Sequence, residues 1–293
     1  MPDDTIPVAG PAGPPSRAAG VRAPGFAASA ARIFELTLGQ MLWSRRTVFM
    51  ALIVGVPLVV AVVARTLSEL EVLPGAMRST VAGPTMFGLM VWVFYVRFIV
   101  PVLAVFYGTA LIADEVEDRT ITYLFTRPVR RGAVLAGKYL AYLTCTALVV
   151  LPSVLVVYFL VIPIGGAGVA RTYPALLADL GILLMGLVAY GALFALVGAT
   201  FRRSLIAGLL FLFAWEPAVL VLPGAFKRVT VAYYLQGLVP HAMPQDGAIS
   251  MLQAVFREVP SLPVSLLVLT GLTVVCLALA GRAVEGKEYI LDR

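Results

Sequence analysis

Six long apolar runs divide this chain of 293 residues and restrict the folds open to it. Each run is close to the roughly 20 residues that a helix needs to cross a hydrocarbon core of about 30 Å. Inside a membrane the backbone must satisfy its own hydrogen bonds, which favours helices. The runs that we interpret as membrane spans are Thr47–Ala64, Val93–Ala113, Tyr139–Ile162, Leu176–Ala199, Ser204–Leu222 and Leu262–Gly281.

The composition supports the same class of protein. Hydrophobic residues make up 60% of the chain and charged residues 13%, and the mean hydropathy is +0.95. Such a chain is too apolar for a soluble domain. We therefore predict an all-α, multi-pass protein of the inner cell membrane with six transmembrane helices. Its two cysteines, Cys145 and Cys276, lie inside apolar runs and are interpreted as small core residues.

Two segments precede the predicted six-span domain, residues 47–293. Residues 1–25 are rich in Pro, Gly and Ala and are predicted to be a disordered tail. Residues 26–46 mix apolar positions with Arg32, Glu35 and Gln40, which favours an amphipathic helix on the membrane surface. The alternative is the first part of an ordinary soluble helix.

Connections between the runs add two expectations. Only Thr200–Arg203 separate the fourth run from the fifth, so these two helices should form a tight hairpin. Residues Thr80–Trp92 are apolar and precede the second run, and we interpret them as an outward extension of its helix.

Basic residues predict the orientation, because Lys and Arg are in excess on the cytoplasmic side of membrane proteins. With the N-terminus inside, 15 of the 22 basic residues are cytoplasmic. They are Arg17, Arg22, Arg32, Arg45, Arg46, Arg119, Arg127, Arg130, Arg131, Lys138, Arg202, Arg203, Arg282, Lys287 and Arg293. Both termini are therefore expected in the cytoplasm.

A charged segment, Ala113–Lys138, separates the second run from the third. It reads ADEVEDRTITYLFTRPVRRGAVLAGK and holds four acids and five bases. Apolar residues stand among these charges, which a passive connection between two spans does not need. The part of this segment that follows Ala113, residues 114–138, is therefore the first candidate for function.

This segment resembles the first cytoplasmic loop of type 2 ABC exporter (ABC-2 type) permeases. The pattern in that family is roughly E-x-E-x-G-T, two or three apolar residues, P-V-S-R, and then G-K before the next span. The residues that match are Glu115, Glu117, Thr120, Leu124, Pro128, Val129, Arg131, Gly137 and Lys138. Arg119 departs from the pattern, because the family commonly has Gly before the Thr.

The resemblance implies a mechanical role for a coupling loop at residues 114–138. In the family, a short helix of this loop sits in a groove on a separate ATPase subunit and transmits its closure to the spans. The expected coupling residues are Glu115, Glu117, Asp118, Arg119, Thr120, Leu124, Pro128 and Arg131. The implied partners are that ATPase subunit, a second permease copy (identical or different) and membrane lipids. We expect no cofactor and no nucleic-acid partner.

A second pattern in the same segment is misleading. Residues Gly132 to Lys138 fit the first seven positions of the nucleotide-binding pattern G-x-x-x-x-G-K. The eighth position is Tyr139, where a Ser or Thr should bind magnesium, and an apolar run follows. We therefore expect no ATP site in this chain, which would depend on its partner for ATP hydrolysis.

Arg97 and Glu216 are the two charges inside the predicted spans that a membrane should tolerate least. Arg97 is 17 residues from Asp114, and Glu216 is 13 residues from Arg203. At roughly 1.5 Å per residue both lie about 20–25 Å from the cytoplasmic ends. Charges within membranes usually pair and face the interior of a helix bundle. We expect Arg97 and Glu216 to meet near the outer end of a transport path; the alternative is that each reaches the outer interface separately.

The predicted function is that of a membrane-spanning permease subunit, which couples ATP hydrolysis on a separate subunit to substrate movement, by export. One alternative is a membrane-embedded enzyme that uses Arg97, Glu216 and His241. The other is a passive six-span channel or scaffold. The sequence shows no catalytic triad, zinc motif or Gly-rich cofactor loop in a supporting context, so we predict no catalytic residue and no metal site.

Overall fold

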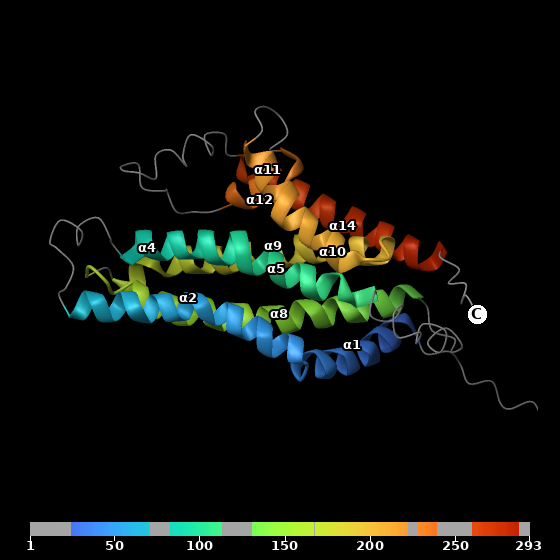
Figure 1. Cartoon of the computed structure of the whole chain (residues 1–293), viewed down its shortest axis with the longest axis horizontal. Coiled ribbons are helices and arrows are strands. Elements are labelled where there is room, and N and C mark those ends of the chain that lie inside the picture. The colour runs from blue at the N-terminus through green and yellow to red at the C-terminus, as the bar shows by residue number, and fades with distance from the viewer. Residues whose placement is uncertain are drawn as a thin grey trace, which may run out of the picture.

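The computed structural model of the chain describes residues 25–70, 83–112, 131–166, 168–221, 228–238 and 260–286. These residues form helices joined by short connections and include no strand. The helices run mainly along the long axis of the molecule (Figure 1). This confirms the predicted all-α class.

Five helices are long and apolar enough to cross a membrane. They cover Arg45–Glu69, Gly83–Ile112, Gly132–Val161, Val169–Thr200 and Leu262–Val284. These correspond to the first four predicted spans and the sixth. The fifth predicted span forms a shorter apolar helix, Ser204–Val219. A multi-pass helical membrane protein is thus supported, whereas the predicted number of six spans is not confirmed.

The first two helices meet at a sharp break. Helix α1 covers Phe26–Leu42 and helix α2 covers Arg45–Glu69. Ser44 caps α2, since its Oγ accepts a hydrogen bond from the backbone N–H of Thr47 at 3.2 Å. Residues 26–46 therefore form α1 and the start of α2, and the placement of this segment on the membrane surface stays a prediction. One side of α1 packs against helix α8, Arg131–Val161 (Figure 1).

The second long helix is continuous from Gly83 to Ile112 but changes its winding. It contains α4 (Gly83–Met90), the π-helical segment η1 (Val91–Ile99), α5 (Val100–Leu103) and a second π-helical segment, η2 (Ala104–Gly108). The helix from Gly83 to Trp92 confirms that the segment ahead of the second apolar run is helical, residues 80–82 lie outside the described part, and the outward direction stays a prediction.

Helix α8 begins before the apolar run that predicted it. It starts at Arg131, not at Tyr139, so residues 131–138 of the predicted loop are its first two turns. Hydropathy identifies only the part of a helix that lies in hydrocarbon. Backbone hydrogen bonding continues into the polar region, because no residue there prevents it. The predicted loop 114–138 is therefore too long by eight residues.

Helix α9, Val169–Thr200, lies at the centre of the bundle. Only Phe201, Arg202 and Arg203 separate it from the next helix, which confirms the predicted tight hairpin. Glycine allows α9 to approach the second long helix closely. A Cβ atom on Gly198 would lie 2.5 Å from the carbonyl oxygen of Thr109. Small residues at such contacts let helix backbones approach within a membrane.

The remaining helices pack on the other side of α9 (Figure 1). The hairpin leads into α10 (Ser204–Leu210), the π-helical segment η3 (Phe211–Trp215) and α11 (Glu216–Val221). A short helix, α12 (Val231–Gln236), and the long helix α14 (Leu262–Gly286) complete the described bundle.

Candidate functional site

Two prolines determine the local winding around the two intramembrane charges. Proline has no backbone N–H, so Pro101 cannot donate to the carbonyl of Arg97 four residues earlier. Pro217 likewise cannot donate to the carbonyl of Phe213. The helix widens before each proline, since the N–H of Val100 bonds the carbonyl of Tyr95 and that of Glu216 bonds the carbonyl of Phe211. π-Helical turns of this kind occur frequently at functional sites.

Both charges lie in or directly next to these widened segments. Arg97 lies in η1, and Glu216 directly follows η3. The side chain of Glu216 is buried, with 5% of its residue surface exposed, whereas Arg97 is half-buried. A buried acid inside a membrane protein is costly and marks a candidate functional site.

Two neighbouring helices hold the carboxylate of Glu216. The hydroxyl of Tyr190 in α9 donates a hydrogen bond to Oε1 of Glu216. The backbone N–H of Ala232, in the first turn of α12, donates a second one. Tyr190 is completely buried, and its ring stacks on that of Phe194 with 6.2 Å between the ring centres. The position of the carboxylate is thus determined from both α9 and α12.

Arg97 is coupled electrostatically to this acid. Its charge acts on both Glu216 and Tyr190. Among the described residues, however, its guanidinium group makes no hydrogen bond and no ion pair within 4.0 Å. Direct contact between Arg97 and Glu216 therefore stays a prediction.

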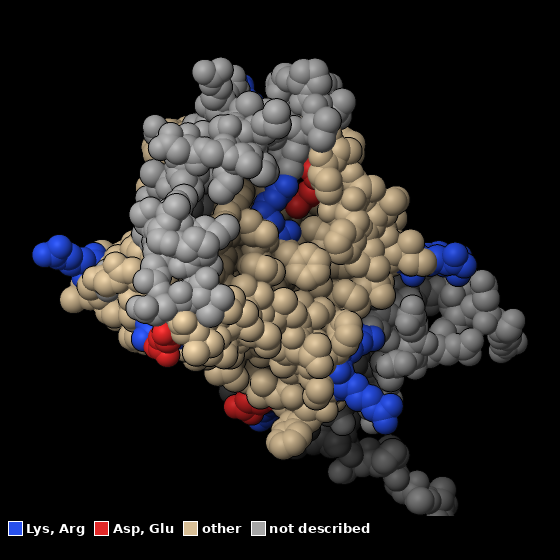
Figure 2. Space-filling view, turned by 60° about the vertical axis from the view of Figure 1, so that its left-hand side comes forward, with Lys and Arg blue, Asp and Glu red and all other residues tan. Residues whose placement is uncertain are grey.

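Charged side chains are rare in the middle of one face of the molecule. Figure 2 shows basic and acidic side chains next to one another in a recess of this face, with uncharged residues below and beside them. The other charged side chains visible among the described residues lie near the edges of the view.

Three residues were missed in the sequence, and two of them are partners of Glu216. Tyr190 and Ala232 become partners of Glu216 only through tertiary packing, so no local pattern could have indicated them. Asp179 in α9 is also completely buried. It is an acid inside an apolar run, and that signal could have identified it beside Arg97 and Glu216.

Most of the predicted coupling residues cannot be placed. Arg131 is the first residue of α8. Seven further residues lie outside the described part of the chain, namely Glu115, Glu117, Asp118, Arg119, Thr120, Leu124 and Pro128. His241, which belonged to the alternative enzyme site, also lies outside it.

A hydrogen bond joins the two helices on either side of the predicted coupling segment. Nζ of Lys138, in the second turn of α8, donates a hydrogen bond to the backbone carbonyl of Leu111 at 3.0 Å. Leu111 is the second-last described residue of the helix Gly83–Ile112. A displacement of the intervening segment 113–130 would therefore reach both helices together.

Gly137 has a packing role that explains part of the misleading nucleotide-binding pattern. A Cβ atom there would lie 2.6 Å from the carbonyl oxygen of Ala30 in α1, so only glycine permits this approach of α1 to α8. Residues 132–138 are helical throughout. They do not form the loop between a strand and a helix that such a phosphate site needs.

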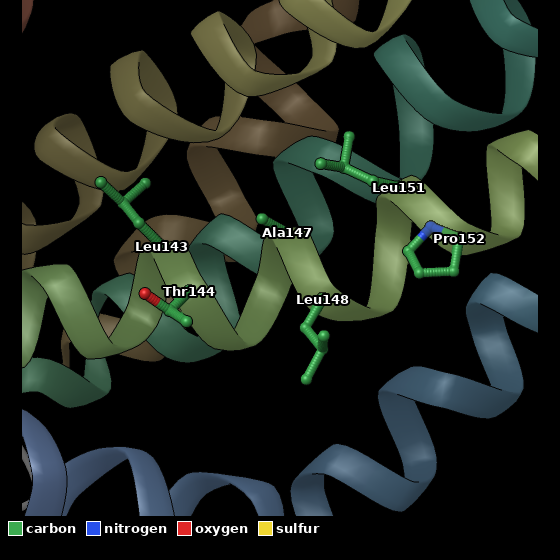
Figure 3. A pocket seen from close by; sticks show the side chains of 6 residues that line it. All are labelled: Leu143, Thr144, Ala147, Leu148, Leu151 and Pro152. Carbon is green, nitrogen blue, oxygen red and sulfur yellow. The ribbon is translucent and has the colours of Figure 1, made fainter.

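A shallow crevice of about 460 Å³ lies on α8 (Figure 3). Pro152 removes the hydrogen bond to the carbonyl of Leu148 and disturbs the helix there. No charged group lines the crevice. Its lining consists of Leu143, Thr144, Ala147, Leu148, Leu151 and Pro152. Nothing in this set can carry catalysis or bind a metal.

Comparison with known families identifies the chain. Residues 45–284 match the family model described as ABC-2 family transporter protein. The match covers the five long helices from Arg45 to Val284, the charged segment and both intramembrane charges. No curated protein matches the chain.

Proposed function

The chain belongs to the ABC-2 family of transporter proteins, and we propose that it is the permease subunit that couples ATP hydrolysis on a separate ATPase subunit to export of a substrate. As a family member it is a component of membrane transport. Two permease copies and two ATPase subunits would form the working transporter. The family match is the observation that carries this proposal.

The bond between Lys138 and Leu111 supports coupling through the charged segment. It joins the helix before this segment to the helix after it. The close contact of α1 with Gly137 adds a third helix to the same end of the bundle. A partner that moves the segment would act on three helices and not on one.

The charge pair supports a transport path within the membrane. Arg97 and Glu216 come from different helices, and their charges interact. We propose that they meet along this path, with Tyr190 holding the acid in place. Charges that face lipid separately would not need this support.

The coupling role is tested by charge reversal in the predicted loop. Glu115→Lys, Glu117→Lys and Leu124→Asp should leave the chain folded in the membrane and lower its association with the ATPase. The reason is that these side chains would contact the partner and not the core of the bundle. The measurements are co-purification of the ATPase with the tagged chain and the ATPase activity of that complex.

Glu69→Lys is the matched control, because it reverses an exposed acid at the end of α2. It should leave the association unchanged. If all three loop variants keep wild-type association and ATPase activity, the coupling role is contradicted and the segment is only an anchor between two helices.

The orientation is tested by labelling in intact cells. In a background without Cys145 and Cys276, single cysteines at Ser44, Thr126 and Ala283 should resist an impermeant thiol reagent. One at Gly168 should react, since the positive-inside rule places it outside. Labelling of Thr126→Cys from outside would contradict both the orientation and the coupling role.

A further inference from the structure

A small group of hydroxyls holds the break between α1 and α2. Ser44 caps α2, and its Oγ lies 3.0 Å from Oγ1 of Thr47. The hydroxyl of Thr47 donates its one hydrogen to the backbone carbonyl of Met41, in the last turn of α1. This bond ties the end of α1 to the first turn of α2.

A tyrosine from a third helix joins this group. The hydroxyl of Tyr107, in η2, lies 2.6 Å from Oγ1 of Thr47. Because Thr47 gives its single hydrogen to Met41, Tyr107 is the donor of this bond. Tyr107 and Thr47 are buried, with 4% and 8% of their surface exposed. A buried hydroxyl that loses its partner is costly, so the bond holds the first turn of α2 against the second long helix.

The two helices at this break are restrained to different degrees. α1 approaches α8 so closely that a Cβ atom on Gly137 would meet its backbone. The break itself consists of Trp43 and Ser44, and Trp43 is 89% exposed, so little packing restrains it. Short connections between helices can absorb the change in backbone angles of a hinge. The first turn of α2 can therefore turn about this break while α1 stays on α8.

Tyr107 also lies close in sequence to the contact that joins the helices around the charged segment. It stands four residues before Leu111, whose backbone carbonyl accepts the hydrogen bond from Lys138. Residues 107–111 thus contact the start of α2 and the start of α8 together. A displacement of these residues would reach the bond between Tyr107 and Thr47.

We propose that Trp43 and Ser44 form a hinge for α2, and that the hydrogen bond from Tyr107 to Thr47 is the latch that keeps this hinge closed. When the latch opens, the first turn of α2 moves away from α8 and uncovers Cys145, a completely buried residue of α8 beside Thr47. This inference goes beyond the coupling role. It concerns the chain by itself, so its test needs no ATPase and its failure would leave the coupling role standing.

The test uses Cys145 as a native reporter. The purified full chain in detergent is treated with N-ethylmaleimide, and mass spectrometry of the peptides follows the labelling of each cysteine over time. A buried thiol reacts when local opening exposes it, so its labelling rate follows the open population. Tyr107→Phe and Thr47→Val should each raise the rate at Cys145 about fivefold or more, the factor expected for the loss of one hydrogen bond. The rate at Cys276, which is buried in α14, should not change.

Tyr95→Phe is the matched control. The hydroxyl of Tyr95 lies 2.6 Å from Oγ of Ser153, and Tyr95 is buried in η1 as Tyr107 is in η2. This variant removes a buried tyrosine hydroxyl away from the break, so Cys145 should be labelled at the wild-type rate. Thr47→Ser keeps the hydroxyl at the latch and should behave in the same way.

Three outcomes would overturn the proposal. The first is wild-type labelling of Cys145 in both Tyr107→Phe and Thr47→Val. The second is an equal increase at Cys276 or in Tyr95→Phe, which would indicate a general loosening of the bundle. The third comes from the double variant, which should be labelled at about the rate of the faster single variant because both changes remove one bond. Rates that multiply would mean two independent effects. If Tyr107→Phe does not fold, Thr47→Val alone decides.

Discussion

Two pairs of opposite charges in this molecule are built in contrasting ways. Arg65 and Glu69 belong to one helix, and Nε of Arg65 lies 2.7 Å from Oε1 of Glu69, with side chains that are 34% and 63% exposed. Arg97 and Glu216 belong to different helices, and they interact without an ion pair within 4.0 Å.

From the comparison we expect that a short distance between two charges is a poor guide to how much the pair stabilises the fold. Exposed pairs four residues apart on a helix contribute about 0.3–0.5 kcal/mol. A buried charge that loses its compensating partner costs about 3–5 kcal/mol. We therefore expect Arg97 and Glu216 to matter more for folding and transport than Arg65 and Glu69.

The largest effect should follow from reversing the buried acid. Glu216→Arg places a second cation beside Arg97 and removes the acceptor of Tyr190, so it should destabilise the fold by about 3–5 kcal/mol. Thermal unfolding in detergent measures this loss. The double variant Arg97→Glu with Glu216→Arg should recover much of it. If the double variant is as unstable as the two single effects combined, the two residues do not interact.

A smaller effect should follow from removing the hydroxyl that holds the acid. Tyr190→Phe loses a hydrogen bond to a charged group and should destabilise the fold by about 1.5–3 kcal/mol. Tyr142→Phe is the matched control, because the hydroxyl of Tyr142 donates to the neutral backbone carbonyl of Leu187 at 2.9 Å. That loss should amount to about 1 kcal/mol. Equal losses of stability in the two variants would show that the hydrogen bond from Tyr190 to Glu216 is no stronger than one to a neutral carbonyl.

The smallest effect should follow from neutralising the exposed pair. Glu69→Gln removes the contact with Arg65 and should lower the free energy of unfolding by no more than about 0.5 kcal/mol. Raising the salt concentration should weaken the wild-type pair in the same direction. A loss as large as that of Tyr190→Phe would remove the contrast between the two pairs.

The sequence predicted the elements of the fold better than their limits. Apolar runs identified five long helices, because hydrophobic length reports directly on membrane crossing. The run from Ser204 to Leu222 formed a helix too short to be counted as a span. The start of α8 was misplaced by eight residues, since hydropathy does not register a helix that continues beyond the hydrocarbon.

The candidate site was predicted only in part. Arg97 and Glu216 were recognisable because a charge inside an apolar run is conspicuous. Tyr190 was not, because six other tyrosines in the spanning helices look the same in the sequence. The prolines at 101 and 217 were visible, but their π-helical segments follow only from how each helix compensates the missing N–H group.

By itself, the sequence determined that this chain is a helical membrane protein of the ABC-2 type, since composition and a local motif carry that information. Three contacts were decided only by the tertiary structure. Lys138 of α8 donates a hydrogen bond to the carbonyl of Leu111, and Gly137 allows the close approach of α1. Tyr190 donates a hydrogen bond to Glu216. These contacts join residues 26 to 107 positions apart. The local periodicity of the sequence does not indicate such pairs, because the packing of whole helices determines which residues come into contact.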